Sequence, residues 1–247
     1  MMQLPSQATR RLNRRVVSMY PLRKLVGGLF LLSGSLSATP IACSDPSLLT
    51  LENYIGLGSS GCTVGDKLFF GFFYVNVGGV VSTADIGVTG FNSPTPGLRF
   101  GPFLVKSPTD IGIGYNVLSL TGPTIKGASL SIAGAGGAGS WAAAVTETAC
   151  FGMIIVNAIS CEDGSSPASI LSAFVFPPDS SAVSSTTFPA VGLLGLFKDI
   201  ILIPGSGPLA VSFVDNRFTP IPEPATMAMV GAGFLVLTWY WKRRRRP

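Results

Sequence analysis

Carboxylates and thiols are the side chains that could do chemistry in this chain, because its 247 residues include no histidine. Paired carboxylates could hydrolyse a glycosidic bond or bind calcium. Nine scattered acids are candidates: Asp66, Asp85, Asp110, Glu147, Glu162, Asp163, Asp179, Asp199 and Asp215. No EF-hand pattern or repeated Asp-Gly motif accompanies them, so the pattern favours solvated turn residues, with calcium binding as the alternative.

The four cysteines have no histidine to activate a thiol, so a catalytic cysteine is not expected. They lack CxxC spacing as well, and we expect no metal site and no cofactor. They fall into two close pairs, 19 and 11 positions apart. Of the three possible connectivities we favour Cys43–Cys62 and Cys150–Cys161, formed in an oxidising compartment.

Two further motifs have simple explanations. The aromatic residues of segment 69–74 could stack on sugar rings, but a strand buried on both faces explains them better. The glycine-rich segment 134–139 is followed by neither the Lys-Ser/Thr nor the helix of a phosphate-binding loop. Together with the missing Ser-His-Asp and Cys-His chemistry, these patterns predict a protein that is not an enzyme.

Charge is distributed unevenly along the chain. Lys and Arg number 17 against 12 Asp and Glu, but six of the basic residues lie in 1–42 and five in 242–246. Residues 43–221 hold six basic and eleven acidic side chains, a net charge of −5. Nucleic-acid binding needs clustered basic residues on the folded surface, so we expect no nucleic-acid partner.

Residues 1–42 have the parts of a secretory signal peptide: a basic lead, the apolar run 25–32 and a tract of small residues. Met19 opens a compact version of the same signal and is a possible true start. A twin-arginine signal at Arg14-Arg15 and a lipobox ending at Cys43 are the alternatives. Each of these readings predicts export of the segment that follows.

Residues 219–247 have the composition of a membrane anchor. Segment 225–241 has no charged residue, and as a helix it would reach about 26 Å, against roughly 30 Å of bilayer hydrocarbon. The basic cluster that follows should stay in the cytoplasm: Lys242, Arg243, Arg244, Arg245 and Arg246. We therefore predict a single transmembrane helix over 225–241.

The tripeptide Pro222-Glu223-Pro224, the apolar segment and the terminal arginines occur in the order of the PEP-CTERM sorting signal of Gram-negative bacteria, which this segment resembles. The resemblance implies that the tripeptide is the sorting motif and that an exosortase, a membrane-embedded protease, recognises the tail. Two prolines would keep the tripeptide extended and accessible to a protease. Segment 43–74 also resembles the start of PEP-CTERM proteins of unknown function, which implies a β-rich domain. A plain anchor without processing is the alternative.

The domain 43–218 should consist of short strands separated by Gly and Pro turns. We predict strands at 67–77, 84–89, 98–106, 111–120, 125–132, 141–148, 152–160, 169–176, 194–203 and 209–218. About ten strands at this spacing favour an antiparallel β-sandwich. Segment 180–187 should be an exposed polar loop. A helical turn or two could form in 46–55, with Asp45 or Ser47 as its N-cap.

These patterns predict an exported, non-enzymatic envelope or extracellular-matrix protein. It would pass through an inner-membrane-anchored intermediate to the cell surface or medium. The family resemblance links such proteins to exopolysaccharide and biofilm, so we expect an exosortase, the membrane and exopolysaccharide as partners. A secreted glycan-active enzyme using two acids and a glycan-binding module on a plain anchor are the alternatives.

Overall fold

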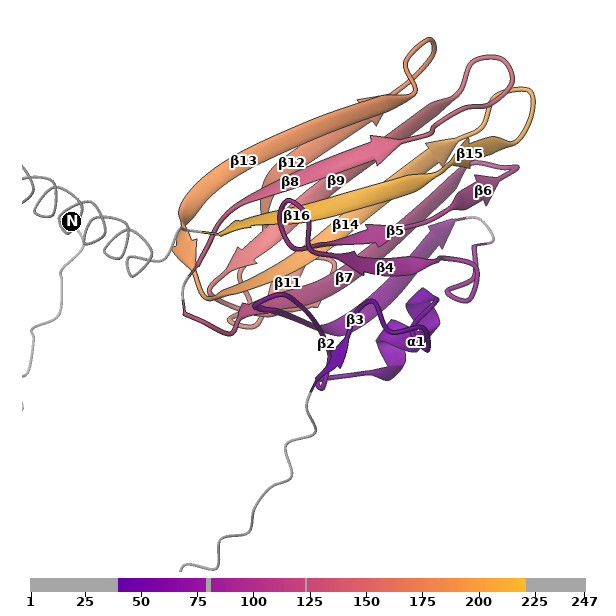
Figure 1. Ribbon diagram of the computed structural model, residues 1–247. Helices are drawn as coiled ribbons and strands as arrows, with labels where there is room; N and C mark the ends of the chain where they lie inside the picture. Colours follow the sequence, from indigo (N-terminus) through magenta and orange to yellow (C-terminus); the bar gives the residue numbers. More distant parts are fainter. Residues whose placement is uncertain (1–39, 79–80, 123, 221–247) are drawn as a thin grey trace, which may run out of the picture. The chain divides into compact units, whose positions relative to one another are not determined.

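Short runs of Val, Ile, Phe and Thr separated by Gly and Pro favour strands joined by turns. The computed structural model describes residues 40–78, 81–122 and 124–220. Two large sheets lie face to face in these residues (Figure 1). The short helix α1 (Leu51–Gly56) packs beside strand β3 (Lys67–Gly78).

The described strands form two large sheets and two short ladders. The seven-stranded sheet has the order β1 (Ile41–Ala42), β2 (Cys62–Val64), β3, β7 (Thr109–Ser119), β14 (Leu193–Ile203), β9 (Ala142–Phe151) and β12 (Ala168–Val175). The five-stranded sheet has the order β13 (Ser181–Val191), β8 (Ile125–Ala133), β16 (Phe213–Pro220), β5 (Gly97–Phe100) and β4 (Val88–Phe91). The ladders join β10 (Ile155–Asn157) to β11 (Ser160–Cys161), and β15 (Leu209–Val211) to β6 (Phe103–Val105). Among the described strands, only β1 and β2 pair in parallel.

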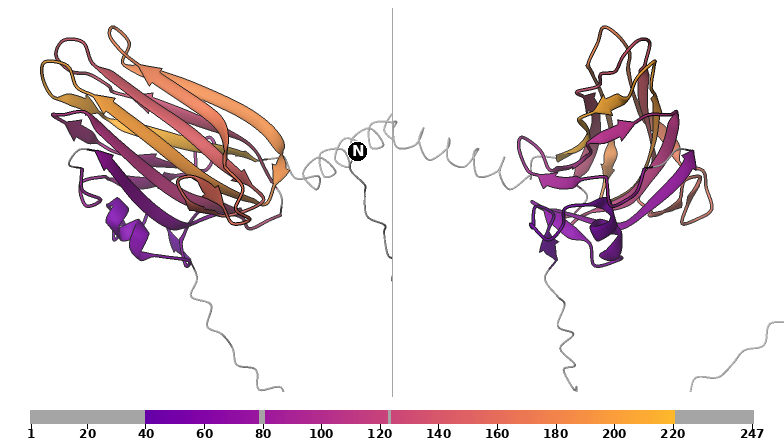
Figure 2. Two further views of the ribbon diagram at one scale, coloured as in Figure 1. Left: turned by 180° about the vertical axis from the view of Figure 1, so that it is seen from behind. Right: turned by 90° about the vertical axis from the view of Figure 1, so that its right-hand side faces the viewer.

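The core lies between the two sheets, where alternate side chains of each strand point inward. Phe69 on β3 and Phe218 on β16 meet across the layers with ring centroids 5.8 Å apart. Phe100 on β5 and Tyr115 on β7 also meet at 5.8 Å, and all four side chains are fully buried. Figure 2 shows the two layers from behind and from the side. The prediction of a mainly β chain built from antiparallel sheets is confirmed.

The structure divides some predicted strands. Segment 98–106 splits into β5 and β6 at Gly101-Pro102, because Pro102 has no N–H to donate to a ladder. Segment 209–218 splits at Ser212, since β15 pairs with β6 whereas β16 pairs with β8 and β5. Of segment 84–89 only the last two residues belong to a strand, β4.

Two predictions of local structure are wrong. Segment 180–187, expected as a loop, forms most of β13 and pairs with β8. Its composition is polar, but alternate side chains such as Ala182 pack on the core, and the β-branched Val183 and Thr residues suit a strand at the sheet edge. Segment 152–160, expected as a strand, instead holds a turn at Gly152, with φ of +73°, followed by the short β10.

The helix begins later than the segment 46–55 predicts, and its N-cap is neither Asp45 nor Ser47. Those two residues form a turn of their own, in which the Ser47 N–H donates to Oδ1 of Asp45 at 2.8 Å. Thr50 is the N-cap of α1. Its N–H and its hydroxyl both donate to Oδ1 of Asn53, at 3.1 and 3.0 Å, which fixes the first turn.

The last described strand lies at the centre of its sheet rather than at an edge. β16 is flanked by β8 and β5, and its final residue Pro220 pairs with Ile125 on β8. Ladders on both sides hold β16 in place. The chain therefore leaves the described fold at the end of a strand that is fixed by two neighbours.

Candidate functional site

Most residues that the sequence singles out for sorting lie outside the described residues. They comprise the signal region up to residue 39, the predicted transmembrane helix 225–241, and Pro222, Glu223, Pro224, Lys242, Arg243, Arg244, Arg245 and Arg246. Ile41 and Ala42, placed in the signal region by the sequence, form β1 and pair with β2. In the part of the chain that the structure describes, no helix is long and apolar enough to cross a membrane.

Both predicted disulfides are formed. Cys43–Cys62 joins the segment after β1 to β2, and Cys150–Cys161 joins β9 to β11. The second bridge thereby holds the β10–β11 ladder against the outer face of the seven-stranded sheet. In the loop-entropy model, bridges closing 19 and 11 positions each restrict the unfolded chain by roughly 3 kcal/mol. Such bridges persist in oxidising compartments.

The nine candidate acids do not gather in one place. Four are exposed in turns or loops: Asp85, Glu162, Asp163 and Asp179. The other five lie in separate settings: Asp66 and Asp215 in partly buried ion pairs with Lys67 and Arg99, Glu147 in the core, and Asp110 with Asp199 on the outer face of the seven-stranded sheet. Among residues 40–78, 81–122 and 124–220, no three acids or cysteines are grouped closely enough to hold a metal ion.

Asp110 on β7 and Asp199 on β14 form a carboxyl pair. Burial, and then the hydrogen bond and charge of Asp110, raise the pKa of Asp199 to about 6. Two positions away along β14, Phe197 stacks on Phe73 with centroids 6.0 Å apart and the rings 14° from parallel. Asp110 is therefore close enough to Asp199 to influence its ionisation, and the two carboxyls form one acidic pair on this face.

Glu147 on β9 and Lys198 on β14 form an ion pair in the core, and both side chains are fully buried. From the opposite sheet, Nδ2 of Asn216 donates to Oε1 of Glu147 at 3.3 Å and to the backbone oxygen of Ser129 at 3.1 Å. The Tyr115 hydroxyl donates to Oδ1 of Asn216. Burial lowers the pKa of Lys198 well below its usual range. This network faces no solvent, so we interpret it as a link between the two sheets.

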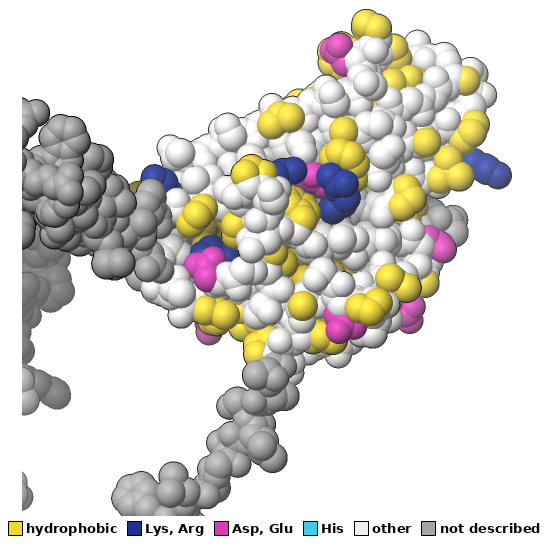
Figure 3. All heavy atoms as spheres, in the orientation of Figure 1, with side chains coloured by type: hydrophobic (Ala, Val, Ile, Leu, Met, Phe, Trp, Pro, Cys, Tyr) yellow, Lys and Arg dark blue, Asp and Glu magenta, His cyan; other side chains and the backbone are white. Residues whose placement is uncertain are grey.

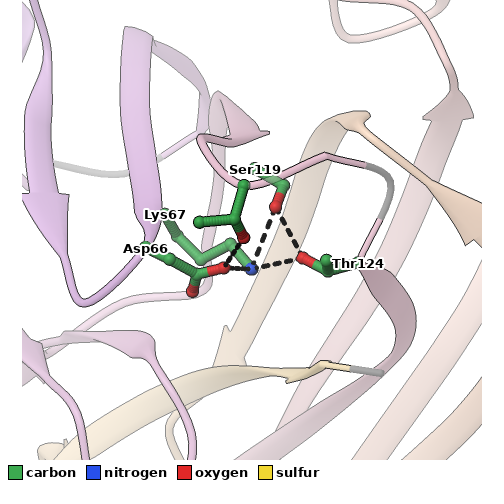
Figure 4. A network of polar contacts seen from close by, with 5 residues as sticks. Asp66, Lys67, Ser119 and Thr124 are labelled. Carbon is green, nitrogen blue, oxygen red and sulfur yellow. Dashed lines mark hydrogen bonds and ion pairs between the residues drawn. The ribbon is translucent and has the colours of Figure 1, made fainter. Parts of the chain in front are cut away.

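A second buried lysine lies where β3 begins (Figure 4). Nζ of Lys67 donates to Oδ2 of Asp66 at 2.5 Å, and also to Oγ of Ser119 at 3.2 Å and Oγ1 of Thr124 at 2.8 Å. These three acceptors use all three donors of an ammonium group. A catalytic Ser-Lys pair needs a neutral amine that accepts the serine proton. The arrangement therefore fixes the start of β3 against the connection between β7 and β8.

The outer face of the five-stranded sheet carries a cluster that we call the arginine ridge: Phe91, Arg99, Phe213, Asp215 and Arg217. Nε and Nη2 of Arg99 donate to the two carboxylate oxygens of Asp215 at 2.7 and 2.8 Å. The Arg99 guanidinium lies over the Phe213 ring, 3.8 Å from its centroid, and that of Arg217 lies 4.6 Å from the Phe91 centroid. Figure 3 shows charged side chains beside hydrophobic ones at the centre of this face.

Strand register assembles the ridge. Phe213, Asp215 and Arg217 alternate along β16, so they share one face, and Asp215 lies directly opposite Arg99 on β5. Hydrogen bonds to Asp215 raise the pKa of Arg99. The sequence analysis did not single out these residues. The period-two spacing along β16 is a signal for them, but the partner Arg99 is 116 positions away and cannot be paired by inspection.

Residues 220–246 match the PEP-CTERM protein-sorting motif. The match begins at Pro220, the last residue of β16, and it includes the Pro222-Glu223-Pro224 tripeptide and the basic cluster. The motif indicates export and membrane-anchored processing, as expected for an exosortase substrate. No curated protein matches the chain.

Similarities to solved structures are distant. TmCBM61 in complex with beta-1,4-galactotriose has 11% identity and a TM-score of 0.31, over 71% of this chain and 99% of that one. The carbohydrate-binding module TmCBM27, studied for mannan recognition, has 11% identity and a TM-score of 0.32, over 64% and 100%. The C-terminal family 22 carbohydrate binding module of Clostridium thermocellum Xyn10B has 11% identity and a TM-score of 0.25, over 74% and 99%.

Proposed function

We propose that this chain, which carries the PEP-CTERM protein-sorting motif, is a non-enzymatic envelope or extracellular-matrix protein that an exosortase processes after export. The observation that carries the proposal is the position of the motif, which begins at Pro220 where β16 ends. Cleavage after the tripeptide would leave every described strand in the released domain. The tail would thus be separable from the fold.

Two properties of the folded part support export. Its two disulfides stabilise a domain that works where thiols oxidise. Its two buried lysines, Lys67 and Lys198, form ion pairs within the fold, so the disulfides and these contacts hold together segments that are far apart in the sequence. Such a domain could be delivered as a finished unit.

The non-enzymatic part of the proposal rests on how the reactive groups are held. The Lys67 ammonium is surrounded by acceptors, the Glu147–Lys198 pair is closed to solvent, and Asp110 lies close enough to Asp199 to help raise its pKa. These arrangements stabilise charge within the fold and leave no general base poised beside a nucleophile. We propose exopolysaccharide as the neighbour of the released domain, which places its role in the matrix or biofilm.

Fractionation of producing cells tests this function. In cells with the exosortase, the protein should be found at the surface or in the medium. In cells without it, or when Pro222, Glu223 and Pro224 are all replaced by Ala, the protein should remain in the inner membrane through segment 225–241. Equal distribution of the wild-type protein in cells with and without the exosortase would show that the tail is a plain anchor.

A further inference from the structure

We infer that the arginine ridge and the hydroxyl surface beside it bind an acidic polysaccharide, with guanidinium groups taking the carboxylates of uronic acid residues. This inference rests on the proposed delivery to the matrix and names the chemistry of the ligand. The first observation is charge. Residues 43–221 carry a net charge of −5, yet the ridge places two guanidiniums, on Arg99 and Arg217, around the single carboxylate of Asp215.

The ridge keeps its carboxylate inside and presents its cations outside. The Asp215 side chain is only 2% exposed, whereas Arg99 is 44% and Arg217 is 32% exposed. Asp215 occupies Nε and Nη2 of Arg99, and the structure gives Nη1 of that side chain no partner among the described residues. An anion approaching from solvent would therefore meet guanidinium N–H donors, and guanidinium groups bind carboxylates in a two-pronged geometry.

The guanidiniums are already held in place. Arg99 is fixed by its two bonds to Asp215 and by the Phe213 ring, and Arg217 stacks on Phe91 and donates to the backbone oxygen of Ser93 at 3.2 Å. Groups that are ordered before binding lose little conformational entropy when the ligand arrives. The same stacking covers a face of Phe213 with a cation, so that face offers no open platform for a neutral sugar ring.

The strands next to the ridge carry short hydroxyl side chains on the same face. Ser131 lies opposite Asp215, and Ser129 lies opposite Arg217. Ser129 in turn lies opposite the exposed Ser185 on β13. Cross-strand partners point to the same side of a sheet, so the hydroxyls of Ser129, Ser131 and Ser185 extend from the guanidiniums toward the sheet edge, beside the exposed Val183 that lies opposite Ser131. A polysaccharide presents hydroxyls along its whole length, and a polyuronate adds one carboxylate per sugar residue. The guanidiniums and the neighbouring serine hydroxyls match these two kinds of group.

Affinity electrophoresis of the mature protein in gels containing polygalacturonate or alginate tests the inference. Fully methyl-esterified polygalacturonate is the matched ligand, because it keeps the backbone and lacks the charge. We expect the wild type to be retarded by the acidic polymers and not by the ester. Retardation should weaken between about 20 and 300 mM salt, as charge contacts at a surface are screened. Failure of both acidic polymers to retard the wild type overturns the inference.

Variants locate the site. Arg217→Gln removes one guanidinium and keeps the Arg99–Asp215 pair, so the fold should be preserved; it should weaken binding by at least about tenfold. Lys106→Gln removes the same charge from the exposed loop between β6 and β7 and should change binding less than about twofold. Ser185→Leu replaces an exposed hydroxyl of this surface by an apolar side chain without a change of charge and should also weaken binding. Equal losses in the two charge variants would assign the binding to net charge and overturn the site.

Polysaccharide binding and exosortase processing are measured independently, so failure of one can be told from failure of the other. A protein that binds polygalacturonate but keeps segment 225–247 supports the ridge and contradicts the exosortase step. A processed protein that ignores both acidic polymers supports the exosortase step and overturns the ridge.

Discussion

Replacement of Lys198 by Met tests whether the buried ion pair links the two sheets. Glu147 and Lys198 are fully buried, and Met fills much of the volume of a lysine side chain. Removing one partner of a buried pair leaves an uncompensated charge and costs about 3–5 kcal/mol. In a domain of about 180 residues each kcal/mol lowers Tm by about 2–4 °C, so Lys198→Met should lower Tm by roughly 6–20 °C at pH 7.

The loss should depend on pH. Without Lys198, the Glu147 carboxyl is buried with no opposite charge beside it, and desolvation disfavours its ionised form. The variant should therefore lose stability as rising pH ionises that carboxyl, and it should be less stable at pH 8 than at pH 5. The double variant Glu147→Leu with Lys198→Met removes both charges and should recover most of the loss, since apolar residues can replace a buried ion pair.

Thermal unfolding followed by circular dichroism, in non-reducing buffer that keeps both disulfides, gives the measurement. Lys106→Met, at an exposed loop position, is the control and should stay within about 2 °C of the wild type. A Lys198→Met protein that also stays within that range at pH 7 and pH 8 would show that the ion pair does not link the sheets. A double variant that is no more stable than the single one would show the same.

Two further predictions concern stability. Replacing Cys150 and Cys161 by Ser should lower the free energy of unfolding by about 3 kcal/mol and speed amide exchange mainly in the β10–β11 ladder; exchange that rises equally in all strands would contradict this. Asp199→Asn should raise Tm by about 2–4 °C at pH 8 and leave it unchanged at pH 4. The folded pKa of about 6 lies above the ordinary value of 3.8, so the wild-type protein loses stability as rising pH ionises this carboxyl. The exposed Asp179→Asn is the control, and an equal rise in both variants would argue against the pair.

The sequence predicts the strand-rich class and the disulfides well, because both follow from local features. Period-two alternation marks β8, and the 19- and 11-position spacings bring each pair of cysteines close along the chain. It fails at β13, where Ser and Thr suggest a loop. That strand forms because its backbone pairs with β8 and its inward side chains pack on the core, and composition does not record a pairing between residues 48 to 66 positions apart.

The buried charges were missed for a related reason. In β14, Leu196, Lys198 and Ile200 alternate, so Lys198 falls on the inward phase and its burial could be read from the pattern. Its partner Glu147 cannot be read in the same way, because the register of β9 against β14 is set by packing over the whole sheet. The same holds for Arg99 and Asp215, whose pairing depends on the register of β5 against β16. Faces are local properties, whereas pairs are set by topology.

The mass of the mature protein tests whether an exosortase removes its C-terminal segment. The protein would be isolated under non-reducing conditions from cells that contain the exosortase, and its intact mass and C-terminal peptide would be measured. We predict a chain that lacks segment 225–247 and keeps both disulfides. Recovery of a chain that still carries segment 225–247 from those cells would contradict the proposed processing.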